Sequence, residues 1–425
     1  MENGNNSFKS GRNRWFYYYV PFKIGQSNLG VLIPLIILDL GGNAGAVGLS
    51  SMLFSLVTII ATMVWGRFSD ETDKRKPYII LGFLGATSCF FILAFATTYL
   101  QVVMVYAIMA FFMAAELPVT PLFLLRNVDK DRWNESFSRF NLICSWALTA
   151  GLVIGGISSV FFDSFYTALI LSFITFLSVL MAKFGIKEST IDVNRSKMGI
   201  FPNHMLERKR FTPNFVLHIP RPSLKMRSNN RGFFIVIALL FTGSNFFFIP
   251  IIPYLKYMGI DDGLIFSVSL SNYIASSLVY ALISRDMRSL GCLGLLRRGI
   301  ITRLVMMLSM LACIMTISNH AFVIVFVFYM LMGAVWPHIY TASITFVSES
   351  SSNNNGGSLM GKYNAVSTFG LMIGSMLSGY VFDIYSLQLC LTIAAVFYVL
   401  AYLVLYKYVK MPSEGADNAV CEVPS

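Results

Sequence analysis

Hydrophobic and polar positions along this chain form long alternating blocks. Twelve of the blocks are apolar runs of about twenty residues, and a helix of that length crosses the ~30 Å hydrocarbon core of a bilayer. We therefore predict twelve transmembrane helices. Their approximate ranges are 15–40, 45–68, 77–99, 101–125, 137–162, 164–186, 232–257, 262–284, 299–318, 320–347, 359–383 and 386–408.

Lysine and arginine are distributed unevenly over the polar blocks. When the N-terminus is placed in the cytoplasm, every cationic side chain lies on the cytoplasmic side except Lys23 and Lys256. The loops on the other side, at 41–44, 98–101 and 383–386, are short and carry no Lys or Arg. Because positively charged loops stay cytoplasmic, we predict a multi-pass protein of the plasma membrane with both termini inside the cell.

The composition is that of a membrane protein. Charged residues make up 12% of the chain, which is about half their share in a soluble protein. The net charge of +11 would suggest nucleic acid in a soluble chain, but here it is spread over cytoplasmic loops. We therefore expect anionic lipids at the cytoplasmic face and no nucleic-acid partner. The six cysteines are scattered without ligand or disulfide spacing, so we expect no metal and no cofactor.

The longest polar stretch separates the sixth and seventh apolar runs. It covers residues 187–231 and holds ten Lys or Arg against three acids, which is typical of a cytoplasmic linker. We therefore divide the chain into five parts. These are an N-terminal tail 1–14, a six-helix bundle 15–186, the linker 187–231, a second six-helix bundle 232–408 and a C-terminal tail 409–425.

The two six-helix units show internal repetition. A shift of 219 residues places Gln26 on Asn245, and it also superimposes four pairs of prolines and glycines. Repeated halves with a substrate site between them are typical of secondary transporters. The fold class that we predict is all-α integral membrane, with twelve transmembrane helices in two pseudo-symmetric six-helix bundles. The four superimposed pairs are Pro34 with Pro253, Pro118 with Pro337, Gly151 with Gly370, and Gly155 with Gly374.

The turn between the second and third runs carries a charged motif, GRFSDETDKRKP, at residues 66–77. It resembles the signature loop of the major facilitator superfamily, G-x-x-x-D-[RK]-x-G-R-[RK]. The residues that fit are Gly66, Asp70, Lys74 and Arg75. With twelve runs, two sets of six and a long central loop, the resemblance covers essentially the whole chain. It implies that this motif is part of a cytoplasmic gate.

In the resembled family, the aspartate of the loop faces the N-terminus of the eleventh span, where the positive end of the helix dipole favours a carboxylate. Here that arrangement would place Asp70 near residues 361–364. The cations of the loop would tie the two halves together when the inward gate is closed. Glu71 and Asp73 depart from the family pattern, so we expect a weakened or rewired latch.

The fifth run contains a second partial match. Its glycines fit the antiporter motif of the resembled family, but Leu152 stands where that motif has proline, so antiport remains open. Small residues four positions apart also let two helices approach closely, which is the alternative interpretation. We expect a helix-packing role for Gly151, Gly155, Gly370 and Gly374.

Two ionisable residues lie at membrane depth, where charge is costly and indicates function. Lys23 lies ~13 Å beyond Arg14, and Glu116 lies ~15 Å from Arg126, at 1.5 Å per helical residue. We predict that Lys23 and Glu116 pair and that substrate or a proton competes for this contact. The alternatives are snorkelling of Lys23 to the interface and a packed helix–helix hydrogen bond for Glu116.

Four further residues are candidates for the binding site. Gln26 and Asn245 would offer a small polar ligand one amide from each half, although simple interhelical bonding is an alternative. Pro337 in the tripeptide Trp336-Pro337-His338 and its repeat partner Pro118 should each bend their span, and bent helices mark binding regions in transporters. Trp336 would stack on a ligand and His338 would titrate near neutral pH, unless the tripeptide is only a packed kink.

We predict a monomeric secondary active transporter that moves a small organic molecule by alternating access, as a symporter or an antiporter. We expect coupling to protons, through Glu116 or His338. The substrate could be an organic cation, a sugar or an aromatic metabolite, while Lys23 would equally suit an anion. Two alternatives are a non-transporting sensor of the same fold and a polytopic membrane enzyme, for which the sequence shows no HExxH motif and no phosphate-binding glycine loop.

Overall fold

The protein folds as a bundle of long helices. The computed structural model describes residues 14–72, 75–127, 133–186, 228–280, 282–316, 320–350 and 356–408, and these contain helices and turns but no strands. Twelve helices are long and apolar enough to cross a membrane. The predicted all-α class with twelve spans is therefore confirmed.

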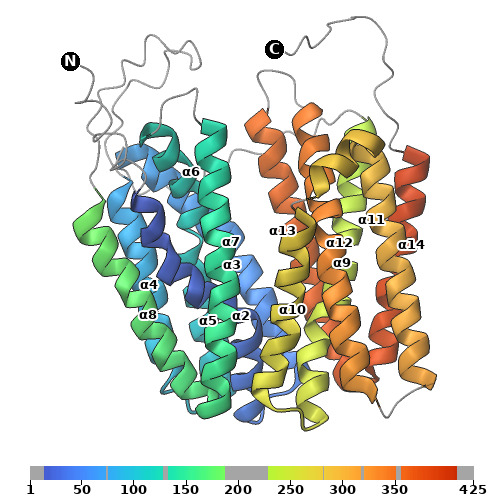
Figure 1. Cartoon of the computed structure of the whole chain (residues 1–425), viewed down its shortest axis with the longest axis horizontal. Helices are drawn as coiled ribbons and strands as arrows, with labels where there is room; N and C mark the ends of the chain where they lie inside the picture. The colour runs from blue at the N-terminus through green and yellow to red at the C-terminus, as the bar shows by residue number, and fades with distance from the viewer. Residues whose placement is uncertain are drawn as a thin grey trace, which may run out of the picture.

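The helices form two groups of six spans, which lie side by side in Figure 1. In the first group a short 3₁₀ helix η1 leads into the first span, and α5 and α6 together make the fourth. Its elements are η1 (Arg14–Tyr19), α2 (Val20–Asp39), α3 (Ala44–Thr72), α4 (Lys76–Leu93), α5 (Tyr99–Met113), α6 (Glu116–Asn127), α7 (Trp133–Phe161) and α8 (Ser164–Gly185).

The second group has one helix for each span. Its elements are α9 (Ser228–Tyr257), α10 (Asp262–Tyr280), α11 (Ile283–Thr316), α12 (Ala321–Glu349), α13 (Gly356–Ile384) and α14 (Leu387–Tyr408). Twelve crossings bring the start of the first span and the end of the last span to the same end of the bundle. We call that end the terminal face and the other end the opposite face.

The described ranges leave most of the predicted tails and linker outside the structure. The tail 1–14 is described only from Arg14, the linker 187–231 only from residue 228, and the tail 409–425 lies wholly outside the described residues. Residues 228–231 belong to α9, which therefore begins within the predicted linker. The division into five parts otherwise remains a prediction.

The fourth span is broken, although its sequence reads as one apolar run. Ala114 and Ala115 form a turn between α5 and α6. Pro118 has no N–H, so it cannot donate to the carbonyl of Ala114 one helical turn earlier. The Leu117 N–H donates to that carbonyl instead, at 3.2 Å, so the regular α-helical pattern is interrupted there. The span predicted over 101–125 therefore consists of two helices, and the predicted effect of Pro118 is a break between them.

The ninth span begins earlier than predicted. The helix α11 extends from Ile283, and within it Gly291 adopts a positive φ of 67°, which separates a short first segment from the long membrane-spanning part. Glycine takes this left-handed conformation at little cost. The predicted range 299–318 missed the first segment because its residues are polar and charged.

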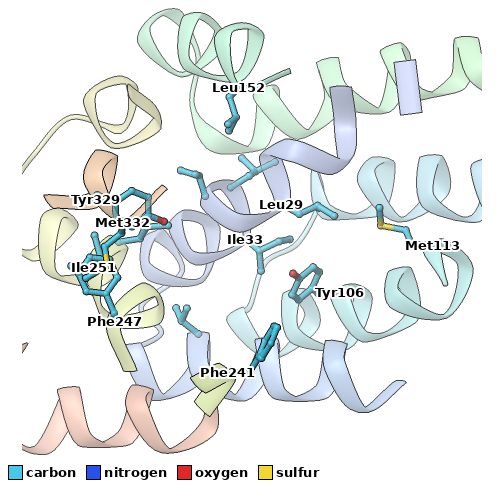
Figure 2. Close-up of a cluster of buried hydrophobic side chains, with 14 of the residues drawn as sticks. Leu29, Ile33, Tyr106, Met113, Leu152, Phe241, Phe247, Ile251, Tyr329 and Met332 are labelled. Carbon is cyan, nitrogen blue, oxygen red and sulfur yellow. The ribbon is translucent and has the colours of Figure 1, made fainter. Parts of the chain in front are cut away.

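A continuous hydrophobic core runs through both groups. Figure 2 shows part of it, where Leu29 and Ile33 of α2 lie between side chains of α5 and side chains of the second group. The labelled residues of the second group are Phe241, Phe247, Ile251, Tyr329 and Met332. The two groups therefore share packed apolar surface in addition to their polar contacts.

Candidate functional site

Three polar side chains meet inside the first bundle. The Lys23 ammonium lies 2.6 Å from Glu116 Oε1 and donates to Glu116 Oε2 at 2.8 Å. It also donates to Gln26 Oε1 at 2.7 Å. The side chains of Lys23 and Glu116 are only 12% and 13% exposed. The pairing that the sequence predicted is present in the structure, and it is nearly closed off from the surface.

The broken fourth span places Glu116 in this cluster. Glu116 is the first residue of α6, so its carboxylate lies where the positive end of the α6 dipole favours a negative charge. The hydroxyl groups of Tyr19 and Thr120 bond at 2.8 Å and join the start of the first span to α6. The break caused by Pro118 therefore creates the helix N-terminus at which Glu116 meets Lys23.

The start of α2 is also held by a hydrogen bond to α8. Pro21 occupies the first turn of α2, and the N–H of the next residue, Phe22, has no carbonyl partner within the helix. That N–H donates to Ser178 Oγ of α8 at 2.8 Å, in a buried position. The helix that carries Lys23 is therefore held by both α6 and α8.

Asn245 does not join a shared amide site with Gln26. Its Nδ2 donates to the Leu371 carbonyl of α13 at 2.7 Å, which is the interhelical bonding that we considered as the alternative. Gln26 is bonded to Lys23, and the described side chains show no contact between the two amides. The amide that bonds across helices in the first bundle is Asn28, which donates to the Gly151 carbonyl at 3.0 Å.

Helix contacts also correct the register of the repeat. In the first bundle, Ile24 and Asn28 of α2 pack against Gly151 and Gly155 of α7. In the second bundle, Ala238 and Thr242 of α9 pack against Gly370 and Gly374 of α13. The step from Ile24 to Ala238, and from Asn28 to Thr242, is 214 residues, whereas the glycines repeat at 219. The predicted correspondence of Gln26 with Asn245 is therefore wrong by five residues.

The four glycines do lie at close helix contacts. A Cβ at Gly151 would collide with the Ile24 carbonyl and the Ser27 side chain, and one at Gly155 would collide with Asn28 Oδ1. The same holds in the second bundle, where a Cβ on Gly374 would lie 2.5 Å from the Thr242 carbonyl oxygen. These contacts are those expected of small residues that let two helices approach backbone to backbone.

Trp336 and His338 of α12 point to different surroundings. The Trp336 ring stacks on Tyr340, with centroids 5.7 Å apart, and meets Phe241 of α9 edge-on at 5.6 Å. His338 Nε2 lies 3.1 Å from Asp286 Oδ2, near the start of α11. No described contact joins His338 to the Lys23–Glu116 pair, so the structure places these two candidates for proton coupling in separate bundles.

Arg303 is a buried cation, although its place in the sequence predicts a cytoplasmic charge. It lies within α11 and is only 1% exposed. Its Nη1 donates to Ser244 Oγ at 3.0 Å and to the Tyr398 hydroxyl at 2.9 Å, and its Nη2 donates to the Met332 carbonyl at 3.2 Å. Its position four residues inside the predicted span 299–318 was the signal that could have identified it.

The gating motif is described only in part. Lys74 lies outside the described residues, and the side chain of Asp70 is not described, so the predicted contact with residues 361–364 stays a prediction. Gly66 faces Pro118 of α6, since a Cβ there would lie 3.7 Å from the proline ring. Arg75 is buried and donates to Ser69 Oγ, which joins the two sides of the turn.

The opposite face carries an ionic network between the bundles. The Lys256 ammonium of α9 lies 2.8 Å from Asp39 of α2 and 2.7 Å from Asp262 of α10. The other carboxylate oxygen of Asp262 accepts from Ser164 of α8 at 3.3 Å. Lys256 was one of two cations predicted to lie away from the cytoplasmic side. In the structure it links both bundles.

A second carboxylate closes the same face. Asp383 of α13 accepts the N–H groups of Ala44 and Gly45 at 3.0 and 2.6 Å, so it caps the N-terminus of α3 from the other bundle. Next to it, Gly48 and Gly379 allow α3 and α13 to touch backbone to backbone. The opposite face is therefore closed by charge, capping and close packing.

Comparison with known proteins assigns the family. A model of the Major Facilitator Superfamily matches residues 19–368 and again residues 296–423. The chain belongs to the Major Facilitator Superfamily. It is therefore a multi-pass membrane protein of a transporter family, with a small molecule as the expected kind of substrate, rather than a member of an enzyme family. No curated protein matches the chain as a relative.

Solved structures of several transporters are similar in fold. The nucleoside transporter NupG has a TM-score of 0.73 and 16% identity over 94% of this chain and 99% of that one. A bacterial homologue of the iron transporter ferroportin, in an inward-facing state, has a TM-score of 0.71 and 10% identity over 94% and 98%. An auto-inhibited peptide transporter of the POT family has a TM-score of 0.68 and 12% identity over 96% and 98%. At these identities the likeness shows the fold alone.

Proposed function

We propose that this superfamily member is a secondary active transporter that moves a small organic molecule by alternating access and is coupled to protons. The observation that carries the proposal is the Lys23–Glu116 pair, with its two side chains only 12% and 13% exposed. Ionisable groups at this depth are costly, so their presence indicates a site for ions or substrate. The substrate would lie between the bundles, near Lys23, Gln26 and Glu116 on one side.

The geometry supports a simple coupling step. While Glu116 is ionised, its carboxylate occupies two of the contacts of the Lys23 ammonium, and Gln26 occupies a third. A proton on Glu116 removes the charge attraction, so Lys23 and Gln26 become available to polar groups of the substrate. Binding of the proton and rearrangement of the substrate site are therefore linked through one ion pair. His338, which faces Asp286, is the second candidate for a proton site.

Alternating access requires the closed face to open. The contacts of Lys256 with Asp39 and of Asp383 with the start of α3 join the two bundles, so they would break when the opposite face opens. At the terminal face the motif residues Gly66, Asp70, Lys74 and Arg75 would provide the alternate closure. We place the terminal face in the cytoplasm of the cell, because its loops carry the positive charge, and the protein in the plasma membrane as a monomer.

Flux through purified protein tests this function. The full chain would be reconstituted in liposomes and assayed with a panel of organic cations, anions, sugars and aromatic metabolites, with and without an imposed pH gradient. We expect at least one compound to accumulate when the gradient is present. Glu116→Gln should keep passive exchange of that compound but lose its response to pH.

The control variant is Asp163→Asn, which removes an exposed carboxylate at the start of α8 and should leave flux unchanged. Flux that ignores the pH gradient in the wild-type protein would reject proton coupling. If thermal melting shows that the protein is folded but no compound is transported, transport itself would be rejected and a sensor would be favoured.

A further inference from the structure

Arg303 is a buried charge without an opposite charge beside it. It is 1% exposed, and no carboxylate among the described side chains forms an ion pair with it. Its three described hydrogen bonds go to a serine hydroxyl, a tyrosine hydroxyl and a backbone carbonyl, all of which are neutral. Buried charges in proteins are normally paired or bound to a ligand. The second bundle therefore holds an uncompensated positive charge.

The guanidinium also has unused donors. It carries five N–H groups, and the described partners accept three hydrogen bonds. The buried Nε–H has no hydrogen-bond partner within the described ranges. A planar guanidinium with free donors on neighbouring nitrogens binds a carboxylate through two parallel hydrogen bonds. The free part of Arg303 thus has the chemistry of a carboxylate-binding group.

Aromatic rings surround the charge. The Arg303 guanidinium lies 5.3 Å from the Trp336 ring centroid and 5.8 Å from that of Phe248. Trp336 is only partly buried, whereas the guanidinium beside it belongs to a side chain that is 1% exposed. The bend at Pro337, directly after Trp336, leaves the Gly333 carbonyl without its helical donor, which weakens α12 next to this ring. A movement of Trp336 would therefore uncover Arg303.

The first bundle does not supply the missing negative charge. The Glu116 carboxylate, which is only 13% exposed, already pairs with Lys23. We propose that Arg303 anchors a carboxylate subsite, and that the substrate is a small organic acid with a planar ring that packs on Trp336. The substrate class rests on the proposed transport function, whereas the subsite itself does not. Ser244 and Tyr398 hold the guanidinium in place and are positioning residues.

Binding of matched aromatic compounds to the purified full chain tests the proposal. Benzoate and benzamide have the same ring and nearly the same shape, but only benzoate carries a charge. We expect benzoate to bind in titration calorimetry at least about tenfold more tightly than benzamide, because a charge-assisted contact is lost in the amide. Benzoate should also change the tryptophan fluorescence, and Trp336→Phe, which leaves four of the five tryptophans, should remove that change.

Variants separate binding from structural support. Arg303→Gln should abolish the preference for benzoate, while Arg303→Lys should keep part of it. Tyr398→Phe removes one hydrogen bond from the same guanidinium but keeps the charge, so it should lower the melting temperature and retain the preference. If Arg303→Gln fails to fold, the comparison of benzoate with benzamide in the wild type and in Trp336→Phe decides the question.

Equal binding of the two compounds to the wild type, or no binding of either, would overturn the subsite. An unchanged preference in folded Arg303→Gln would do the same. If benzoate binds as expected but no organic acid is transported in liposomes, the subsite stands and the transport function fails. If a neutral compound is transported while benzoate does not bind, transport stands and the carboxylate subsite is rejected.

Discussion

At the scale of single residues, the protein depends on charges that lie inside its transmembrane helices. Lys23 and Glu116 neutralise each other across 2.6 Å, whereas the Arg303 guanidinium donates to neutral acceptors and lies beside aromatic rings. Removing one member of a buried pair leaves the other charge without compensation, whereas removing both does not. This asymmetry gives a direct test of the pair.

Lys23→Met should lower the free energy of unfolding more than the double variant Lys23→Met/Glu116→Gln. Breaking a buried pair costs about 3–5 kcal/mol, and this is an upper value here because both side chains keep slight exposure. Thermal melting in detergent gives the order of stability of the wild type, the single variant and the double variant. A double variant that is less stable than the single variant would show that the pair contributes no mutual compensation.

Gly155 of α7 tests the close contact between α7 and α2. An added methyl group would collide with Asn28 Oδ1 and lie 2.9 Å from Phe266 of α10. Gly155→Ala should therefore destabilise the protein by about 1–3 kcal/mol through overpacking. Gly30→Ala is the control, because nothing lies within 4 Å of the Cβ position there. Equal melting temperatures for the two variants would argue against a packing role.

At the scale of helices, the broken fourth span is the element that creates the site. The break at Ala114 and Ala115 gives α6 a free N-terminus inside the membrane, and Glu116 occupies it. A continuous helix would carry Glu116 on a different face and would lack this terminal dipole. The position of the charge therefore depends on Pro118, which stands two residues beyond it.

Pro118→Ala should restore the missing N–H, straighten the span and separate Glu116 from Lys23. We expect a protein that is at least as stable as the wild type in thermal melting but has lost most of its flux. Pro34→Ala in α2 is a comparison that removes a helical proline away from the break. Flux in Pro118→Ala equal to that of the wild type would show that the break is not needed for function.

The apolar runs predicted the helix ends well where an apolar run and its helix begin and end at nearly the same residues. The sixth run was placed at 164–186 and α8 covers Ser164–Gly185, and the twelfth was placed at 386–408 and α14 covers Leu387–Tyr408. Pro118 predicted a bend in the fourth span, but the turn at Ala114 and Ala115 could not be located, because the residues around it are as apolar as those within the helices. Hydropathy does not distinguish a helix from a turn that is buried among helices.

The predicted site was partly right, for identifiable reasons. The pair of Lys23 and Glu116 could be predicted because opposite charges at similar depth attract each other. The match of Gln26 with Asn245 failed because the offset of 219 residues holds between α7 and α13 but not between α2 and α9. Arg303 was missed because it lies near the cytoplasmic end of the predicted span 299–318, so it was counted with the cytoplasmic cations.

At the scale of the whole molecule, two bundles meet at the opposite face through a few specific contacts. Lys256 bridges Asp39 and Asp262, and Asp383 caps α3 from the other bundle. These groups are partly exposed, so water can replace the contacts at modest cost when the bundles separate. The network is therefore suited to a face that opens and closes.

Lys256→Met should weaken closure of the opposite face. The variant leaves Asp39 and Asp262 facing each other without the cation, so like charges repel where the bundles meet. We expect faster labelling of a cysteine introduced at the buried Ala46 of α3 in a cysteine-free background. The control is Lys407→Met, which removes an exposed lysine near the end of α14. Unchanged labelling in Lys256→Met would show that the ionic bridge does not hold the face closed.

The central claim, that the two bundles open alternately to either side, is tested most directly by distances at both faces of one protein. Spin labels would be placed in a cysteine-free background at Phe162 and Tyr385 on the opposite face, and at Thr72 and Asn364 towards the terminal face, all of which are exposed. Electron–electron resonance would be recorded with and without a transported compound and at two pH values. We expect the two distances to change in opposite directions, the first lengthening as the second shortens. Distances that change in the same direction, or do not change under any condition that supports flux, would contradict alternating access.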